Sequence, residues 1–296
     1  MDKNLLKILN YKSYILVDSI PCLMPKKQNN DYEKVKKANI QYYNKIASFY
    51  EEEPEQAELQ NNFNQRRIQK IIKRLSEKTE ANYFLDIGCG TGNLLKFGQK
   101  YFKNTVGIDV SLNMLKIAKE RGYSVIQADA AHLPFKSGVF DVISTFSVLH
   151  HLYDYSLLIK EATRTLKPGG FLYTDWDPQK RPKIDENKIS WQIFKFIRNL
   201  YKKTKPSPEK KYSNVQKLAE YHNLYKQGEE RGISFDQLKE ILIKNNFINI
   251  QPTFHWAGKS LNQLPLSLKI RFWFLKFQDY PLERFMENIM IIAQKK

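Results

Sequence analysis

A glycine-rich segment with an acidic residue inside it is the part of this sequence that most directly predicts chemistry. Residues 85–92 read Leu-Asp-Ile-Gly-Cys-Gly-Thr-Gly, so glycine occupies every second position from Gly88 to Gly92. Glycines at this spacing let the backbone approach a ligand closely where a helix begins. A dinucleotide site has the different spacing Gly-x-Gly-x-x-Gly, and the carboxylate of Asp86 would repel a pyrophosphate but attract an ammonium group. The segment therefore favours a ligand that carries a cationic group.

Two further acidic residues follow predicted strands at positions that suit a nucleoside. Asp109 ends one apolar segment, and Asp129 follows the next. A carboxylate at the first position can accept hydrogen bonds from both ribose hydroxyls. One at the second can accept a hydrogen bond from an adenine amino group. Either residue alone is more often a solvated loop residue, but both occur in order after the glycine turn, with the strand 140–143 behind them. Together they predict an adenosyl ligand.

Two adjacent histidines, His150 and His151, follow the strand predicted over 140–145. An imidazole can take a proton from a hydroxyl group near neutral pH, so either residue is a candidate general base. The alternative is a structural role, because a strongly driven group transfer can proceed through in-line positioning of the reactants alone. The sequence leaves both alternatives open.

The elements that would position these residues alternate between strand and helix. An amphipathic helix is predicted over 61–77 and another up to about residue 100. The helix 111–121 has Ser111 as a plausible N-cap, and the helix 155–166 is followed by a turn at 167–170. The predicted strands are 83–87, 105–109, 124–128, 140–145 and 171–175. This alternation indicates a doubly wound parallel sheet, whose ligands bind beyond the carboxyl ends of the strands.

The alternation is interrupted twice in the second half of the chain. Residues 180–211 hold eleven Lys or Arg against three Asp or Glu, with aromatic residues at helical spacing, and predict a basic amphipathic helix. The core resumes with a helix over 234–245 and strands over 247–253 and 288–294, between which residues 257–284 form a second insertion. The expected division is a leader and lid helix over 1–60, a cofactor-binding half over 61–178, a basic insertion over 179–232, and a C-terminal core part over 233–296.

Five segments of the chain resemble the successive motifs of class I methyltransferases that use S-adenosylmethionine, and most closely the ubiquinone/menaquinone-type small-molecule subgroup. They read DIGCGTG, VGIDVS, QADAAHLPF, FDVISTFSVLHHL and LKPGGFL. The resemblance covers residues 42–175 and, more loosely, 234–294. It implies an α/β fold with a doubly wound, seven-stranded Rossmann-like sheet and an antiparallel last strand, preceded by a helical extension and carrying two cap insertions.

The resemblance also implies which residues contact the S-adenosylmethionine cofactor. The glycines would surround its methionine part, Asp109 its ribose and Asp129 its adenine. The expected set is Asp86, Gly88, Cys89, Gly90, Gly92, Asp109, Val110, Met114, Asp129, Ala130 and Phe146. Residues 43–50 resemble the helix that such enzymes fold over the cofactor as a lid, which makes Tyr43 and Tyr50 candidate substrate contacts.

Residues 14–25 faintly resemble the end of the zinc-ribbon-like leader of some methyltransferases. The cysteine pairs that would hold zinc are absent, because the chain has only Cys22 and Cys89, far apart. No metal is expected, and the segment is interpreted as packing or remnant structure.

The composition limits the partners less sharply than the motifs do. A net charge of +17 and a pI near 9.6 favour anionic partners. The abundance of Lys, Asn and Ile is equally typical of an AT-biased coding sequence, so the charge has two explanations. No continuous apolar run suggests a signal peptide or a spanning helix, and a cytoplasmic location is expected.

The predicted acceptor of the methyl group is a small molecule or a lipid-like compound, bound between the lid helix and the two insertions. Aromatic residues such as Trp191 in the first insertion support an apolar acceptor. The alternatives are methylation of RNA, supported by the basic segment 180–211, and a non-catalytic partner protein with the same fold. The segments 191–201 and 266–277 are interpreted as a lid over the acceptor, with peripheral contact to a membrane surface as the alternative.

Overall fold

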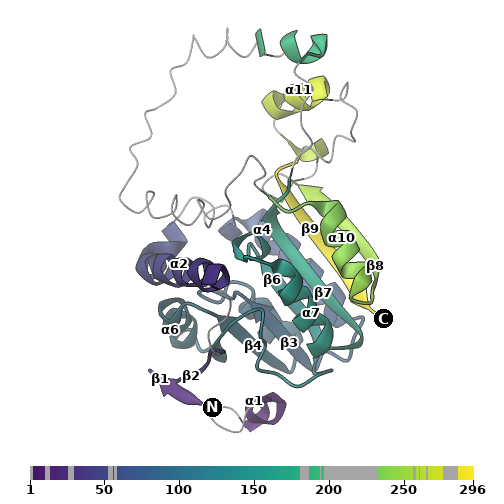
Figure 1. Ribbon diagram of the computed structural model, residues 1–296. Coiled ribbons are helices and arrows are strands. Elements are labelled where there is room, and N and C mark those ends of the chain that lie inside the picture. The colour runs from purple at the N-terminus through teal and green to yellow at the C-terminus, as the bar shows by residue number, and fades with distance from the viewer. Residues whose placement is uncertain are drawn as a thin grey trace.

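A nine-stranded mixed sheet forms the centre of the computed structural model of this protein (Figure 1). The structure describes residues 3–10, 14–25, 30–52, 56, 59–180, 187–193, 195–196, 232–255, 258–259, 261–264, 266–275 and 286–296. The strand order is β1-β2-β5-β4-β3-β6-β7-β9-β8. The α/β class and the mixed sheet agree with the expectation, whereas the number of strands exceeds the seven expected by two.

The central part of the sheet consists of five parallel strands whose side chains are largely buried on both faces. They are β3 (Tyr83–Ile87), β4 (Asn104–Asp109), β5 (Val125–Ala128), β6 (Phe140–Phe146) and β7 (Leu166–Pro178). Near-continuous apolar runs are typical of parallel strands covered by helices on both sides. The chain winds outward from β3 through β4 to β5, then returns to β6 on the other side of β3. A ligand crevice is expected where this direction reverses, at the carboxyl ends of β3 and β6.

An antiparallel pair of strands completes the sheet at one edge. β9 (Asn288–Lys295) lies between β7 and β8 (Phe247–His255) and runs antiparallel to both. The expected antiparallel last strand is therefore confirmed. β7 begins earlier than expected, at Leu166, which pairs with Phe140 of β6. The predicted turn 167–170 falls in the register irregularity between this pair and the next one, Val142 with Phe171.

Helices cover the two faces of the sheet. α4 (Asn62–Ser76) and α5 (Leu95–Tyr101) pack on one face, and α7 (Tyr155–Thr165) and α10 (Phe235–Lys244) pack on the other. α6 (Leu112–Glu120) begins at Ser111, whose hydroxyl accepts a hydrogen bond from the amide of Met114. Ser234 caps α10 in the same way. Both expected N-caps are confirmed, and each satisfies an amide that the first helical turn leaves unpaired.

The two additional strands form a hairpin near the N-terminus. After α1 (Lys3–Ile8), β1 (Ile15–Val17) pairs antiparallel with β2 (Ile20–Leu23), which adds in parallel to the edge strand β5. Asp18 and Ser19 both have positive φ, as a two-residue hairpin turn of this twist requires. The expectation of seven strands was therefore wrong at this edge, where the leader-like segment 14–25 extends the sheet.

A long helix and a short 3-10 turn lie over the carboxyl ends of the central strands. They are α2 (Asn30–Ile46) and η1 (Ala47–Glu52), and Figure 1 shows α2 above α6. Asn44 anchors this pair to α6: its amide oxygen accepts hydrogen bonds from the Ser111 hydroxyl at 2.8 Å and the Asn113 amide at 3.1 Å. The helix expected over 43–50 thus comprises the last turn of α2, which starts at residue 30, and most of η1.

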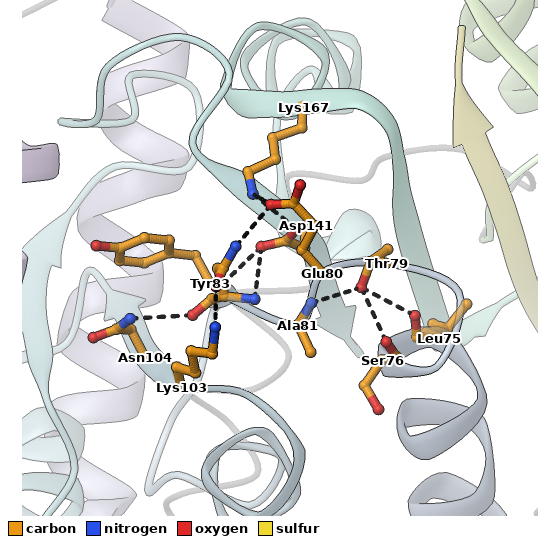
Figure 2. A network of polar contacts seen from close by, with 11 residues as sticks. Leu75, Ser76, Thr79, Glu80, Ala81, Tyr83, Lys103, Asn104, Asp141 and Lys167 are labelled. Atoms are coloured by element: carbon orange, nitrogen blue, oxygen red, sulfur yellow. Dashed lines mark hydrogen bonds and ion pairs between the residues drawn. The ribbon is translucent and has the colours of Figure 1, made fainter.

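A buried carboxylate holds the opposite, amino-terminal end of the sheet together (Figure 2). Asp141 in β6 accepts hydrogen bonds from the amides of Asn82 and Tyr83 at 3.1 and 2.7 Å, just where β3 begins. Lys167 at the start of β7 donates to the same carboxylate at 2.9 Å and reaches Glu80 at 3.1 Å. Asp141 therefore joins three strands at the end of the sheet remote from the glycine turn.

The insertions are described only in part. Residues 189–193 and 195–196 are helical, and the second insertion contains η3 (Leu261–Gln263) and α11 (Leu266–Leu275). The predictions for residues 197–231 and 276–284 lie outside the described residues, and the four-part division of the chain stays a prediction. Among the described helices, none has the length and apolar character needed to cross a bilayer.

Candidate functional site

The glycine turn after β3 adopts a backbone conformation that side chains disfavour. Gly88 and Gly90 have φ values of +68° and +52°, in the left-handed region that glycine occupies without steric cost. A Cβ atom on Gly88 would lie 2.5 Å from Cγ2 of Val148, so the Val148 side chain or the turn would have to shift. One on Gly90 would have only the Tyr50 ring nearby, at 3.8 Å. Gly90 therefore presents its backbone to open space beneath Tyr50.

That open space is a pocket at the carboxyl ends of β3, β4, β5 and β6. It encloses about 830 Å³ of space, which includes open solvent at its mouth. The lining is mostly apolar, with Asp109 and Asp129 among the charged groups. Of the expected site residues it includes Gly88, Gly90, Asp109, Val110, Met114, Asp129, Ala130, Phe146, Tyr43, Tyr50 and His151.

The carboxylate of Asp109 joins the glycine turn to the start of α6. Its two oxygens accept hydrogen bonds from the amide of Gly90 at 3.0 Å and from the amide of Ser111 at 2.8 Å. Burial raises the pKa of Asp109, while these backbone amides act in the opposite direction. The side chain lines the pocket and keeps partial exposure, so its remaining lone pairs are accessible from the pocket.

The carboxylate of Asp129 is buried and already has partners from α2. The hydroxyl of Tyr32 and the amide of Ala131 donate to one oxygen, and Lys36 donates to the other at 3.2 Å. Burial and the hydrogen bond to Asp129 raise the pKa of Tyr32 well above its ordinary value, so its hydroxyl stays protonated and acts as a donor. α2 is thus tied directly to the acid that ends β5.

Asp86 lies behind the glycine turn in a fully buried position. Its carboxylate accepts a hydrogen bond from the hydroxyl of Ser144 in β6 at 2.7 Å. Burial raises the pKa of Asp86 from 3.8 to about 7, against the lowering effect of Ser144 and together with the nearby charge of Asp109. A buried carboxylate with so weak a local counter-charge favours a cation nearby. Asp86 does not line the pocket itself.

The two histidines have different environments. The ring nitrogen Nε2 of His151 lies 2.8 Å from the hydroxyl of Tyr43, and both side chains line the pocket. His150 instead turns to β7, where its Nδ1 donates to the buried carboxylate of Asp177 at 2.8 Å. The two imidazole rings are 3.8 Å apart. Only His151 of the two expected catalytic residues therefore reaches the pocket.

The glycine turn is also held from above by η1. Glu51 accepts hydrogen bonds from the hydroxyl of Thr91 and from Arg121, and Arg121 also donates to the carbonyl of Thr91 at 3.1 Å. The hydrogen bond from Arg121 lowers the pKa of Glu51. η1 is therefore connected directly to the glycine turn, whereas the first half of α2 is connected to Asp129 after β5.

An aromatic pair forms the wall of the pocket toward β7. Phe146 lines the pocket and stacks on Trp176, with ring centroids 5.4 Å apart and an interplanar angle of 24°. Trp176 has a φ of +64°, which is rare for a bulky residue and marks local strain. Its backbone amide donates to Asp175, which also pairs with Arg67 and His255 at 2.8 Å each. This buried network fixes the aromatic wall.

Comparison with known proteins supports one family. Residues 85–174 match the family described as "Methyltransferase domain". An uncharacterized protein of Methanocaldococcus jannaschii, MJ1252, is 31% identical over 81% of this chain and 87% of that protein. Demethylmenaquinone methyltransferase of Lactococcus lactis is 30% identical over 64% of this chain and 74% of that protein. The tRNA (carboxymethyluridine(34)-5-O)-methyltransferase of Arabidopsis thaliana is 35% identical, over only 36% of this chain and 27% of that protein.

A solved structure agrees with the fold. Phosphoethanolamine N-methyltransferase 2 of Haemonchus contortus, in complex with phosphomonomethylethanolamine and S-adenosylhomocysteine, superposes with a TM-score of 0.56 at 18% identity. The match covers 92% of this chain and 61% of that one. This chain belongs to the S-adenosylmethionine-dependent methyltransferases.

The residues of this methyltransferase fit its cofactor. The glycine turn leaves free backbone at Gly90, and the pocket lining includes two carboxylates, Asp109 and Asp129, together with apolar residues such as Met114. An adenosyl group needs this combination of acceptors for ribose and amino protons and an apolar slot for its ring.

Four expected site residues besides Asp86 do not line the pocket of the methyltransferase. The thiol of Cys89 packs against Gly107, and Gly92 packs against Tyr123. His150 pairs with Asp177. Trp191 is buried within the first insertion. The first two shape the turn from behind, and a role for Trp191 in acceptor binding stays a prediction.

Several pocket residues of the methyltransferase are not among those predicted from the sequence. Those on α2 share one helical face, and the others follow β6: Tyr32, Val35, Lys36, Asn39, Ser147, Val148, Leu152 and Tyr153. The spacing of Tyr32, Val35, Lys36, Asn39 and Tyr43 is that of one side of a helix, and a helix predicted over 30–46 would have identified them. Asn39 also donates to the carbonyl of His151 at 2.9 Å.

Proposed function

We propose that this methyltransferase transfers a methyl group to a small or lipid-like apolar acceptor that binds beneath α2, beside Phe146 and His151. The observation that carries the proposal is the pocket itself, which is mostly apolar and is lined on one side by residues of α2. A polymeric acceptor would need an open groove, whereas a small apolar molecule gains from enclosure. The relative from Lactococcus lactis, a demethylmenaquinone methyltransferase, supports the same acceptor class.

In this proposal the cofactor lies across the carboxyl ends of β3, β4 and β5. S-adenosylmethionine supplies an electrophilic methyl group on a sulfonium. The backbone of Gly88 and Gly90 would hold its methionine part, with buried Asp86 supplying negative charge behind the turn. Asp109 would accept from the ribose hydroxyls, and Asp129 from the adenine amino group. Because Tyr32 and Lys36 already donate to Asp129, they either share that carboxylate with adenine or move away from it.

The acceptor would enter on the side of Phe146 and Tyr43. The hydrogen bond between Tyr43 and His151 places a group that can accept a proton at the pocket wall. For a hydroxyl or acidic carbon acceptor, His151 would receive the proton, with Tyr43 holding its ring in place. His150 would act from behind as a positioning residue, because Asp177 orients its ring and the ring contacts that of His151.

Transfer of a radioactive methyl group tests the acceptor class. The protein is incubated with methyl-tritiated S-adenosylmethionine and either a short-chain demethylated quinone, a polar lipid extract or total tRNA. The proposal expects tritium in the organic phase and none in the RNA. Replacement of Phe146 by Ala should lower transfer without a matching loss of cofactor affinity, and His151→Ala should lower kcat more than it changes the Kd of S-adenosylhomocysteine. Tritium in RNA alone would overturn the proposal.

Methylation of RNA is the second candidate. Its support is the net charge of +17 and the tRNA-modifying relative from Arabidopsis thaliana, which matches little more than a third of this chain. If RNA binds, its affinity should fall steeply with salt as phosphate contacts release counterions. Weak, salt-insensitive retention of tRNA would exclude this candidate.

A further inference from the structure

The two insertions expose apolar side chains in an ordered pattern. In the first insertion Ile189, Ile193 and Phe196 lie on the helical segment 189–196, at spacings of four and three residues. In α11, Leu266, Ile270 and Trp273 have the same spacings. Residues so spaced share one face of a helix. We call these six residues the cap surface.

The cap surface is exposed to solvent, although each of the two segments also has a buried side. The exposed fractions of its six residues lie between 45% and 75%. On the other sides of the same segments, Trp191 and Leu275 are buried, as is Leu264 just before α11. Each helix therefore buries one side and presents a second apolar side outward. Single scattered exposed apolar residues are common, whereas exposed apolar residues gathered on one face mark an interaction site.

The charges beside the cap surface have one sign. Residues 187–196 contain Lys188 and Lys195, and α11 contains Lys269 and Arg271, while neither segment contains Asp or Glu. The chain as a whole carries a net charge of +17. Short helices that combine an apolar face with Lys and Arg are typical of segments that lie in the head-group region of a membrane.

We propose that the cap surface docks this protein on an anionic lipid bilayer. Both segments lie at the same end of the molecule, beyond the edge where β7 ends and β9 begins (Figure 1). Apolar side chains would enter the acyl boundary, and the basic side chains would contact lipid phosphates. α11 has ten residues, too few to span a bilayer, so the association is peripheral.

Two other occupants fit the charges less well. A second copy of the chain, paired through a twofold axis, would bring the same basic residues against each other. RNA would satisfy the charges but would leave six apolar side chains against phosphate and sugar. An anionic bilayer satisfies both features of the cap surface at once. The proposal concerns membrane binding alone and holds whichever acceptor the enzyme methylates.

Vesicle cosedimentation tests the proposal. The full chain is mixed with vesicles of phosphatidylcholine alone or with phosphatidylglycerol added, in low and moderate salt, and bound protein is measured in the pellet. The proposal expects binding to the anionic vesicles, reduced but not abolished by salt, and little binding to phosphatidylcholine. Replacing Ile193, Phe196, Ile270 and Trp273 together by Ser should weaken binding about tenfold or more, since each removes apolar burial in the interface.

Matched variants distinguish binding through the cap surface from nonspecific binding through other exposed apolar or basic residues. Ile243→Ser with Ile248→Ser removes two apolar residues of similar exposure on α10 and β8 and should leave binding unchanged. Lys188→Gln, Lys195→Gln and Lys269→Gln together should weaken binding to anionic vesicles, whereas Lys239→Gln with Lys244→Gln in α10 should weaken it far less. Unchanged thermal unfolding and S-adenosylhomocysteine binding would show that each variant is folded.

Three outcomes would overturn the proposal. The first is no binding of the parent protein to anionic vesicles at low salt. The second is binding that the Ser variant retains in full, because the apolar stripes then contribute nothing. The third is a parent dimer in sedimentation velocity that the Ser variant converts to monomer, because a second copy then covers the cap surface. None of these results depends on methyl transfer, so they leave the proposed acceptor class unaffected.

Discussion

The isosteric change Asp86→Asn should stabilise the free protein and weaken cofactor binding at the same pH. The carboxyl of Asp86 is buried against Ser144, and its pKa rises from 3.8 to about 7. That rise corresponds to about 4 kcal/mol between the two protonation states. In the folded free protein, the ionised form is therefore disfavoured by this order of free energy, and asparagine removes the cost while keeping an acceptor for the Ser144 hydroxyl.

The sign follows from proton linkage. Between pH 4 and 7 the unfolded chain has released the proton of Asp86 while the folded chain still holds it. The free energy of unfolding of the parent therefore falls as pH rises through this window, relative to that of the variant. Above pH 7 the difference should level off at a few kcal/mol, at most about 4, in favour of Asp86→Asn. Urea unfolding of both proteins from pH 4.5 to 8.5 measures this difference directly.

Cofactor binding should show the opposite dependence. S-adenosylmethionine carries a sulfonium and an ammonium, which favour ionised Asp86, so the parent's affinity should rise with pH up to about 7 and then level off. The variant should bind more weakly at pH 8 and lack this rise. Ser144→Ala removes a hydrogen bond that lowers the pKa, and should move the inflection to higher pH. Calorimetric titration measures this binding, and equal pH profiles for the parent and Asp86→Asn would refute the reasoning. So would urea unfolding in which the variant is less stable than the parent at pH 8.

Three further changes test other parts of the site and fold. Asp109→Ala should weaken S-adenosylhomocysteine binding by about 1.5–3 kcal/mol, the scale of hydrogen bonds to a charged group; unchanged affinity in calorimetry would remove its ribose role. Gly88→Ala should destabilise the protein more than the control Gly138→Ala, because both have positive φ but only the first meets Val148 at 2.5 Å; equal melting temperatures would contradict this. Asp141→Asn should lower the free energy of unfolding by about 2–4 kcal/mol without changing cofactor affinity, since Asp141 lies at the other end of the sheet.

Most of the sheet could be predicted because its strands are buried on both faces. Runs such as Tyr83–Ile87 have few polar residues and end at glycine or acid, so their limits are visible in the sequence. Except at β7, which is longer at both ends than predicted, they agree with the structure within a residue or two. The hairpin of β1 and β2 could not be predicted in the same way. Its strands have three and four residues, too few to show a period, and they are stable only because β2 adds to β5.

The lid helix was predicted only at its end for a related reason. α2 is rich in Lys and Asn, and its apolar stripe is narrow, so its helical pattern is weak over residues 30–42. Its position depends on contacts remote in sequence, such as Lys36 with Asp129 and Asn44 with Ser111. These pairs are defined by how α2 crosses the sheet, which local sequence does not specify.

The predicted site residues divide according to how they were inferred. Asp109, Asp129 and the glycine turn follow from strand ends, and topology alone brings strand ends together. Two other contacts depend instead on the register between neighbouring strands. The contact of Asp86 with Ser144 depends on the register of β3 and β6, and that of His150, which follows β6, with Asp177 depends on the register of β6 and β7. Register is set by packing across the sheet, so the sequence could indicate that His150 and His151 are near the pocket but not that only His151 reaches it.

The two ends of the sheet use buried charge in different ways. At the amino end, Asp141 has two amide donors and the Lys167 ammonium, so its charge is compensated within the fold. At the carboxyl end, Asp86 has one hydroxyl donor and a pKa near 7, so its charge is left for a cation that the protein itself does not supply. The strained backbone of Trp176 and Ser147 lies at this same end. Ionised Asp86 destabilises the free protein, and a cationic ligand nearby would offset this cost. The change Asp86→Asn, which should stabilise this end of the sheet, should therefore also weaken cofactor binding.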